Sequence, residues 1–162
     1  MNNEELIIKR ATEKDVPIIL SFIKKIAEYE KLSNEVIATE EILRESLFGK
    51  KPSAEVVIGY LESKPAAYAV YFYNFSTFIG KKGLYLEDLF VLPELRGKGI
   101  GKKMLLYLIQ KTSDEHCGRM EWSVLDWNEP AINFYKSLGA KPLDEWTIFR
   151  MDEAAIKKVL SS

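Results

Sequence analysis

The sequence predicts a mixed fold of the α/β or α+β class, and the order of its apolar segments is the main reason. Runs rich in β-branched and aromatic residues occur once near the N-terminus, three times in the middle and twice later. Segments with helical spacing separate the first run from the middle three, and they alternate with the later ones. A meander of strands joined to a crossover unit predicts one mixed sheet with helices on both faces.

Length and composition place this sheet in one soluble domain covering residues 1–162. The hydrophobic content is 47% and the net charge is −1, so a core can form and the basic surface of a nucleic-acid binder is lacking. Cys117 is the only cysteine, which excludes an intrachain disulfide. The N-terminus does not have a signal-peptide pattern, and no apolar run is long enough to span a membrane. We therefore expect a cytoplasmic protein with no membrane partner.

The N-terminal third predicts a strand and two helices. Residues 6–9 form a short apolar run, and Thr12 can cap a helix with Asp15 three residues later. That helix has apolar residues at helical spacing: Val16, Ile19, Leu20, Ile23 and Ala27. A second helix begins at Thr39, carries Ile42, Leu43 and Leu47, and ends at Gly49.

The remainder predicts further strands and helices. Three strands are expected at residues 56–58, 66–75 and 84–92, followed by a helix whose core face is Leu105, Leu108 and Ile109. Next come a strand at 120–125, a helix at 128–138 that stops at Gly139, a strand at 146–151 and a final helix. Trp122 and Trp146 are expected to be core aromatics.

A glycine-rich turn lies between a predicted strand and a predicted helix, at residues 96–103. Glycines let a phosphate approach the backbone, and the helix N-terminus supplies free N–H groups. Arg96, Lys98, Lys102 and Lys103 add positive charge. A dinucleotide-binding fingerprint would need glycine at Lys102, and a Walker A motif would need glycine at Arg96 and Ser or Thr at Lys103. The turn therefore fits a different diphosphate site, or a tight turn that binds nothing.

The residues Arg96, Gly99 and Gly101 resemble the acetyl-CoA motif of the GNAT superfamily of N-acetyltransferases, Arg-x-x-Gly-x-Gly. Residues 128–140 resemble that superfamily's second coenzyme-binding segment. More narrowly, residues 85–91, 96–101 and 127–135 resemble the spermidine/spermine (diamine) and thialysine N-acetyltransferases. The resemblance touches most of the chain, including Glu28-Tyr29-Glu30 in the first helix.

The resemblance implies a mostly antiparallel sheet that is splayed into a V, with the pantetheine arm of the coenzyme in the gap. Backbone groups of Leu89, Phe90 and Val91 would pair with that arm as an extra strand would. The implied coenzyme-binding residues also include two further groups, one in the turn and one in the later helix. They are Arg96, Gly97, Lys98, Gly99, Ile100, Gly101, Lys102, Asn128, Ala131 and Asn133.

Acetyl transfer to an amine poses two proton problems. A primary ammonium has a pKa of about 10, so deprotonating it at pH 7 costs about 4 kcal/mol, and the departing thiolate benefits from a proton. The resemblance makes Tyr135 the acid near the sulfur and Glu87 the base near the amine, directly or through a water. Adjacent carboxylates in a strand point to opposite faces, so Glu87 and Asp88 share a wall only if the strand contains a bulge.

The acceptor is expected to be a small cationic amine. Tyr29, Glu30, Glu87 and Asp88 supply carboxylates and an aromatic face for it, with Trp127 as a further candidate. Many polyamine enzymes of this family carry Tyr-Asp-Pro-Trp before the predicted strand at residues 84–92. This chain has residues 75–78, Phe-Ser-Thr-Phe, which resemble the thialysine branch more closely, and the sequence leaves both acceptors open.

Three other expectations follow. His116 and Cys117 are adjacent but do not suffice for a metal site, which takes three or four ligands, so no metal is expected. The family resemblance implies a homodimer. The alternative functions are an inactive acyl-CoA-binding sensor and an acetyltransferase that acts on a protein lysine or N-terminus, although Tyr135 and Glu87 favour an active enzyme.

Overall fold

The structure, a computed structural model, describes residues 5–161. It divides into two compact units, one ending at residue 123 and the other beginning at residue 124. Among the described residues, no helix combines the length and apolar character needed to cross a lipid bilayer.

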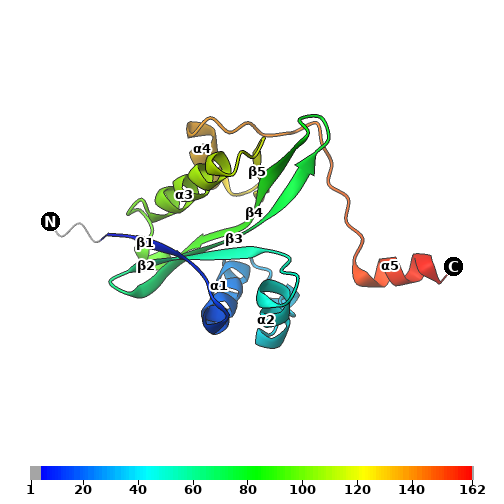
Figure 1. Cartoon of the computed structure of the whole chain (residues 1–162), viewed down its shortest axis with the longest axis horizontal. Coiled ribbons are helices and arrows are strands. Elements are labelled where there is room, and N and C mark those ends of the chain that lie inside the picture. Colours follow the sequence, from blue (N-terminus) through cyan, green and yellow to red (C-terminus); the bar gives the residue numbers. More distant parts are fainter. Residues whose placement is uncertain (1–4, 162) are drawn as a thin grey trace. The chain divides into compact units, whose positions relative to one another are not determined.

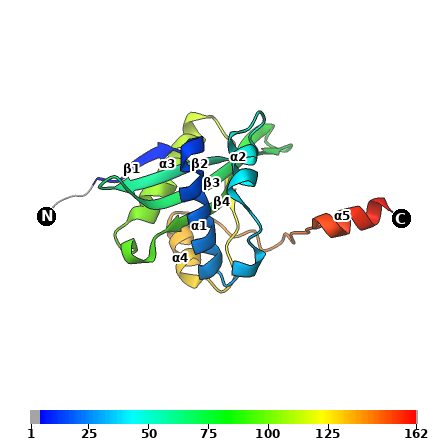
Figure 2. The same cartoon turned by 90° about the horizontal axis from the view of Figure 1, so that it is seen from below.

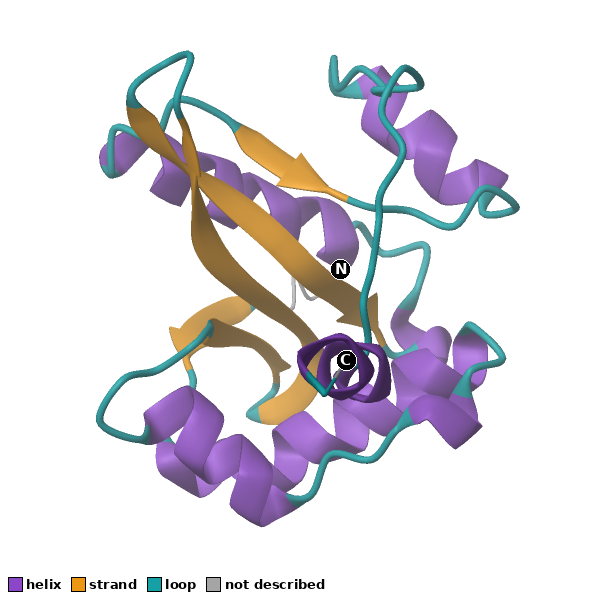
Figure 3. Ribbon diagram, turned by 90° about the vertical axis from the view of Figure 1, so that its right-hand side faces the viewer, coloured by secondary structure: helices purple, strands orange, loops and turns teal. Residues whose placement is uncertain are grey.

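The N-terminal unit contains a five-stranded sheet in the order β1-β2-β3-β4-β5. The strands are β1 (Ile7–Arg10), β2 (Glu55–Leu61), β3 (Lys64–Ser76), β4 (Lys81–Val91) and β5 (Met120–Trp122). The first four pair antiparallel with their neighbours, whereas β5 is parallel to β4. The predicted mixed, mostly antiparallel sheet is confirmed, and Figure 3 shows β3 and β4 as its longest, twisted pair of strands.

Helices cover both faces of this sheet. Helix α1 (Val16–Tyr29) and helix α2 (Glu40–Phe48) lie on one face, and α3 (Ile100–Asp114) lies on the other (Figures 1 and 2). Short 3-10 turns occupy Glu13–Asp15, Ser33–Glu35 and Pro93–Leu95. The predicted cap positions are confirmed, although Thr12 caps the 3-10 turn at Glu13–Asp15 and α1 itself begins at Val16. The backbone N–H of Thr12 donates to the Asp15 carboxylate (2.7 Å), and the Thr39 hydroxyl accepts from the N–H of Ile42 (3.2 Å).

Each sheet face has its own core. On the α1 face, Phe22 stacks on Tyr68 with ring centroids 4.9 Å apart, beside Ile19, Ile58 and Phe90. On the α3 face the sheet meets a set of buried helix residues with i, i+4 spacing: Ile100, Met104, Leu105 and Leu108.

The prediction for the core face of α3 was partly wrong. Ile109 is 39% exposed, whereas Ile100 and Met104 are buried. The helix begins at Ile100, so its buried stripe is centred on residues 100, 104 and 108, and Ile109 lies beyond the edge of that stripe.

A β-bulge interrupts β4 at Glu87. Val70 of β3 faces Asp88, but the next residue, Tyr71, faces Leu86, so Glu87 is the extra residue on β4. The parallel pairing of β4 with β5 stops at the same point, with Leu86 opposite Trp122. This explains why β5 ends at Trp122 although the sequence predicts a strand through residue 125.

The C-terminal unit contains α4 (Glu129–Ser137) and α5 (Glu153–Leu160). As predicted, Asn128 caps α4, and Gly139 follows it with a left-handed φ of 88°. The strand predicted at residues 146–151 is absent, and Trp146 is 77% exposed, so it is not a core aromatic. An alternating pattern becomes a strand only where a neighbouring strand completes its hydrogen-bond ladder, and residues 146–151 have no such pairing in the described part of the chain.

Candidate functional site

Beyond the bulge, one edge of β4 is open within the N-terminal unit. The strand continues from Glu87 to Val91 with β3 on one side, but its pairing with β5 covers only Leu84 to Leu86. Leu92 donates its N–H to the carbonyl of Ala66 on the β3 side (3.0 Å). Backbone groups alternate along an antiparallel strand, so Phe90 also faces β3 and Leu89 and Val91 face the open edge. The edge can pair with an extended ligand through Leu89 and Val91.

The glycine-rich turn connects this edge to the N-terminus of α3. Gly97 and Gly99 have φ values of 78° and 76°, and a Cβ at either position would meet no atom within 4 Å. The first i to i−4 hydrogen bond of α3 runs from the N–H of Lys103 to the carbonyl of Gly99. The N–H groups of Ile100, Gly101 and Lys102 come before this bond and therefore have no acceptor within the helix. A short loop with open space, free donors and the exposed Lys98 and Lys102 fits a diphosphate.

The side chain of Arg96 contacts the strand and the first helix. Its Nε donates to the carbonyl of Val91 (3.1 Å). Its guanidinium carbon lies 4.5 Å from the ring centroid of Tyr29 and 5.2 Å from that of Phe90. One face of Tyr29, predicted to receive a cationic acceptor, is thus already in contact with a cation of the protein itself.

Carboxylates from α1 and β4 gather beside Tyr68. The Tyr68 hydroxyl donates to Asp88 Oδ2 at 2.6 Å. Burial raises the pKa of Asp88, and the hydrogen bond from Tyr68 partly opposes that rise. Burial also raises the pKa of Glu30, with the negative charge of Asp88 as the second cause. The pKa of Tyr68 is raised by burial first and then by Asp88, Glu30 and Glu87. The structure therefore brings together Glu30, Glu87 and Asp88, three of the predicted acceptor residues.

The bulge brings the charges of two adjacent acids to Tyr68. Without it, the faces of β4 would continue to alternate, and Asp88 would lie on the α3 face with Leu86. With it, Asp88 lies opposite Val70 and Tyr85 lies opposite Phe72, so both are on the α1 face. Glu87 is exposed, while its charge still reaches the Tyr68 hydroxyl. The bulge predicted from the pair of acids is confirmed.

Glu30 is held by the way α1 ends. Glu30 follows the last helical residue, and Lys31 adopts the left-handed φ of 62°. The N–H of Leu32 donates to Ala27 (2.8 Å) and that of Lys31 to Glu28 (3.1 Å), the double closure of a Schellman motif. The backbone of Glu30 is therefore fixed at a defined helix end rather than in a free loop.

The predicted residues of the C-terminal unit lie on α4 and its cap. The Asn128 side chain accepts from the N–H of Ala131 at 3.4 Å, and Asn128, Ala131 and Tyr135 share the half-buried side of the helix. Burial raises the pKa of Tyr135, which keeps its phenol protonated at neutral pH. Asn133 is exposed on the opposite side of α4, and Trp127 is exposed before its start.

Tyr68 is the site residue that sequence reasoning missed. Its sequence neighbours are apolar, so it reads as part of a buried strand, and its side chain is fully buried. Only the pairing of β3 with the bulged β4 shows that its hydroxyl meets Asp88. The pairing register of β3 with β4 across the bulge would have identified Tyr68, and this register cannot be predicted from the sequence.

The run that precedes β4 forms the tip of the β3–β4 hairpin. The N–H of Gly80 donates to the carbonyl of Ser76 (2.8 Å), which closes the turn. Phe75 and Phe78 are exposed there, and Ser76 is buried. The aromatic run predicted near the acceptor is therefore a surface tip of the hairpin.

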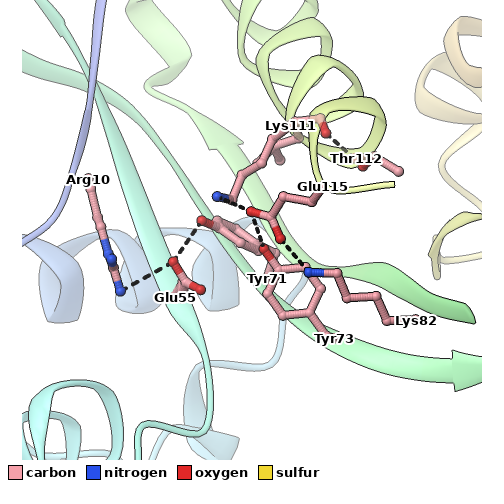
Figure 4. Close-up of polar contacts among 9 residues, drawn as sticks. Arg10, Glu55, Tyr71, Tyr73, Lys82, Lys111, Thr112 and Glu115 are labelled. Atoms are coloured by element: carbon pink, nitrogen blue, oxygen red, sulfur yellow. Dashed lines mark hydrogen bonds and ion pairs between the residues drawn. The ribbon is translucent and has the colours of Figure 1, made fainter. Parts of the chain in front are cut away.

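A second polar network lies on the α3 face of the sheet (Figure 4). Glu115, the residue that follows α3, accepts from Lys82, Lys111 and Tyr73 at 2.6, 2.6 and 2.9 Å. Hydrogen bonds from Lys111 and Lys82 lower the pKa of Glu115 to about 2. In a separate group of contacts Tyr71 donates to Glu55, which also pairs with Arg10 (Figure 4). The contacts of Glu115 join the end of α3 to the sheet, and those of Glu55 join β1, β2 and β3.

The N-terminal unit also has a shallow cavity of about 370 Å³, lined by Arg10, residues 52–55, Phe72 and Tyr73. Within residues 5–161, no group of three or more His, Cys, Asp or Glu side chains is placed to hold a metal ion. His116 is exposed, and Cys117 is half-buried.

Comparisons with known proteins agree with this geometry. The profile of the "Acetyltransferase (GNAT) family" matches residues 23–140. A thialysine N-epsilon-acetyltransferase of Bos taurus is 37% identical over 95% of this chain and 96% of its own length. An L-ornithine N5-acetyltransferase of Arabidopsis thaliana is 29% identical over 94% of this chain and 86% of its own. The solved structure of an integron cassette protein of V. cholerae superposes with a TM-score of 0.81 at 26% identity, covering 97% of this chain and 98% of its own.

Proposed function

The chain belongs to the GNAT acetyltransferase family and is an acetyl-CoA-dependent N-acetyltransferase that acts on a small-molecule amine; on that premise we propose that its acceptor is a cationic amino acid with a primary amine at the end of its side chain. Thialysine and ornithine, named in two similar proteins, both have this form. The observation that carries the proposal is the grouping of Glu30, Glu87 and Asp88 beside Tyr68, which offers negative charge to a terminal ammonium. The family profile crosses the boundary at residue 123, which supports one acetyltransferase domain made from both units.

The coenzyme fits two features of the N-terminal unit. Leu89 and Val91 would pair with its extended arm, and the N–H groups at the start of α3 would bind its diphosphate, with Gly97 and Gly99 leaving room for the phosphates. Acetyl-CoA supplies the activated acetyl group as a thioester. Asn128 and Ala131 would contribute from the C-terminal unit, on the same side of α4 as Tyr135.

The acids of the site have separate tasks in this proposal. Asp88 and Glu30 attract and orient the ammonium, because burial makes their charges costly without a cation nearby. Glu87, the exposed residue of the bulge, takes the proton from the ammonium, directly or through a water. Tyr135 donates its phenolic proton to the sulfur that leaves, since burial keeps that phenol protonated.

The experiment that tests the proposal is a thiol-release assay with purified protein, acetyl-CoA and a panel of amines. The panel contains thialysine, ornithine, lysine, putrescine, spermidine and a lysine-containing peptide. We expect the highest kcat/KM with an amino acid that carries a terminal amine. A preference for spermidine would assign a polyamine acceptor, and a preference for the peptide would assign a protein acceptor. Coenzyme binding by calorimetry without release on any amine would indicate a sensor.

A homodimer belongs to the same proposal. Apolar side chains of the C-terminal unit are exposed in the single chain, including Trp146, Ile148 and Phe149 (91% exposed), and a second copy would remove them from water. Light scattering on the eluting peak of a size-exclusion column should give twice the mass of 18.6 kDa. A mass of one chain at micromolar concentration would contradict this part of the proposal.

A further inference from the structure

Arg96 links the coenzyme turn to the end of α1 that carries Glu30. It follows β4 and is the first residue of the glycine-rich turn, yet its side chain lies against Val91, Phe90 and Tyr29. Two of these partners belong to β4, and the third is the last residue of α1. Arg96 therefore bridges the two elements that supply the acids of the acceptor site.

The site needs such a bridge because its acids repel one another. Glu30 extends from α1 and Asp88 from β4, and the charge of Asp88 raises the pKa of Glu30. Like charges on separate elements push those elements apart unless another contact holds them. The nearby cation that contacts both elements is Arg96, bonded to the carbonyl of Val91 at 3.1 Å and packed on the ring of Tyr29 at 4.5 Å.

We infer that Arg96 is a positioning residue for the acceptor: it holds Tyr29, and through it Glu30, at the distance from Asp88 that an ammonium requires. This inference rests on the proposed amine acceptor. It assigns the guanidinium to acceptor affinity, in place of the coenzyme-binding role that the family resemblance implies for Arg96, because the side chain is directed to Val91 and Tyr29. The backbone of residues 97–102 and the exposed Lys98 remain available for the coenzyme phosphates.

The planar guanidinium is essential to this role. It can donate from Nε to a carbonyl while its face packs on an aromatic ring, whereas an ammonium is a compact, strongly hydrated charge that does not do both. Arg96→Lys keeps the positive charge and loses the bridge. Tyr29→Leu removes the aromatic ring and leaves Arg96 in place.

The test compares these two variants, their combination and Lys98→Gln, a charge removal two residues away in the same turn. The acceptor KM is measured at saturating acetyl-CoA by thiol release, the coenzyme Kd by calorimetry, and folding by the melting temperature. Arg96→Lys should raise the acceptor KM by about tenfold and change the coenzyme Kd by less than about twofold, since it loses the packing of the guanidinium on Tyr29 and one hydrogen bond. Tyr29→Leu should raise the acceptor KM by a similar factor, and the double variant should be no worse than either single one. Lys98→Gln should weaken coenzyme binding and leave the acceptor KM near the wild-type value.

Three results would overturn the inference: a wild-type acceptor KM in Arg96→Lys, a loss of coenzyme affinity in Arg96→Lys that matches Lys98→Gln, or effects of Arg96→Lys and Tyr29→Leu that multiply. If Arg96→Lys does not fold, Tyr29→Leu alone decides, because an unchanged acceptor KM there excludes the bridge. Turnover of the wild-type protein on the amine panel tests the proposed function separately, so its failure is distinguishable from the failure of the bridge.

Discussion

If Asp88 binds the acceptor as proposed, the hydrogen bond from Tyr68 to Asp88 should make acceptor binding depend on pH in a way that one substitution can measure. Asp88 is half-buried, which raises its pKa, and the Tyr68 hydroxyl stabilises the ionised form through a hydrogen bond of 2.6 Å. Tyr68→Phe removes this donor from a fully buried side chain and leaves the ring in contact with Phe22. The substitution therefore changes the charge of the acceptor site with little change in its packing.

The size of the effect follows from the charge on the acceptor of that bond. A hydrogen bond to a charged group contributes about 1.5–3 kcal/mol, and one pKa unit corresponds to about 1.4 kcal/mol. Tyr68→Phe should therefore raise the pKa of Asp88 by about one to two units. Because a cationic acceptor requires the ionised carboxylate, the acceptor KM should begin to rise at a pH about one to two units higher than in the wild-type protein.

The assay is the acceptor KM between pH 5 and 9 at saturating acetyl-CoA. The acceptor amine, with a pKa of about 10, remains largely cationic over this range, so the shift reports the protein. Tyr60→Phe is the matched control, since Tyr60 also donates to a carboxylate, Asp15 at 3.5 Å. The reasoning would be refuted if the acceptor KM of Tyr68→Phe began to rise at the same pH as in the wild-type protein or at a lower one. An equal shift of this pH in Tyr60→Phe would refute it as well.

The same bond gives a stability readout with a definite sign. Burial raises the pKa of Asp88, so this group contributes stability at low pH that is lost as the pH rises through its folded pKa. Removing the donor enlarges that loss. The destabilisation caused by Tyr68→Phe should accordingly be greater at pH 7 than at pH 4, as measured by urea unfolding.

Four further predictions concern other parts of the protein. Tyr135→Phe should keep coenzyme affinity and lower kcat by about a hundredfold, and wild-type turnover would remove Tyr135 from the mechanism. Glu87→Gln should raise the pH needed for full activity, whereas an unchanged pH–rate profile would indicate that the amine loses its proton to solvent. Gly99→Ala should lower stability by about 1 kcal/mol. It should also lower coenzyme affinity by about tenfold or more, because the methyl group fills space left for a phosphate. The control Gly80→Ala, at the hairpin tip with a similar φ of 69°, should lower stability alone. Glu115→Gln should lower the free energy of unfolding by about 1–2 kcal/mol at pH 7, and this difference should shrink as the pH falls from about 4.5 towards 2, since the pKa of Glu115 is lowered to about 2.

Much of the fold could be predicted because local chemistry marks its boundaries. Thr12, Thr39 and Asn128 cap helices where the sequence predicts them, and Gly139 follows the end of α4. The strand at residues 146–151 was wrongly predicted because its alternating pattern depends on a partner elsewhere in the chain. A strand is a property of a pair of segments, while a helix is largely a property of one.

In the candidate site, too, features set by neighbouring residues could be predicted, whereas contacts between distant residues could not. The bulge at Glu87, expected from the two adjacent acids and the splay that the resemblance implies, is confirmed, and the glycines expected to leave the turn open have left-handed φ values at Gly97 and Gly99. The bond between Tyr68 and Asp88 and the packing of Arg96 on Tyr29 join residues 20 and 67 positions apart, which no local pattern specifies. In the proposed site, those contacts separate the residues assigned to the acceptor from those assigned to hold them in place.

Because of the single extra residue in β4, the side chains that face α3 have even numbers before the bulge and odd numbers after it. Before it, the apolar residues under α3 are the even-numbered Leu84 and Leu86, and after it they are the odd-numbered Leu89 and Val91. Deleting Glu87 would restore a uniform period of two along the strand, and one half would have to turn its apolar side chains towards α1. Either Asp88 and Phe90 would exchange places with Leu89 and Val91, or the strand would lose its register with β3. A change of one residue in length at this point should therefore be more harmful than most substitutions of the same residue.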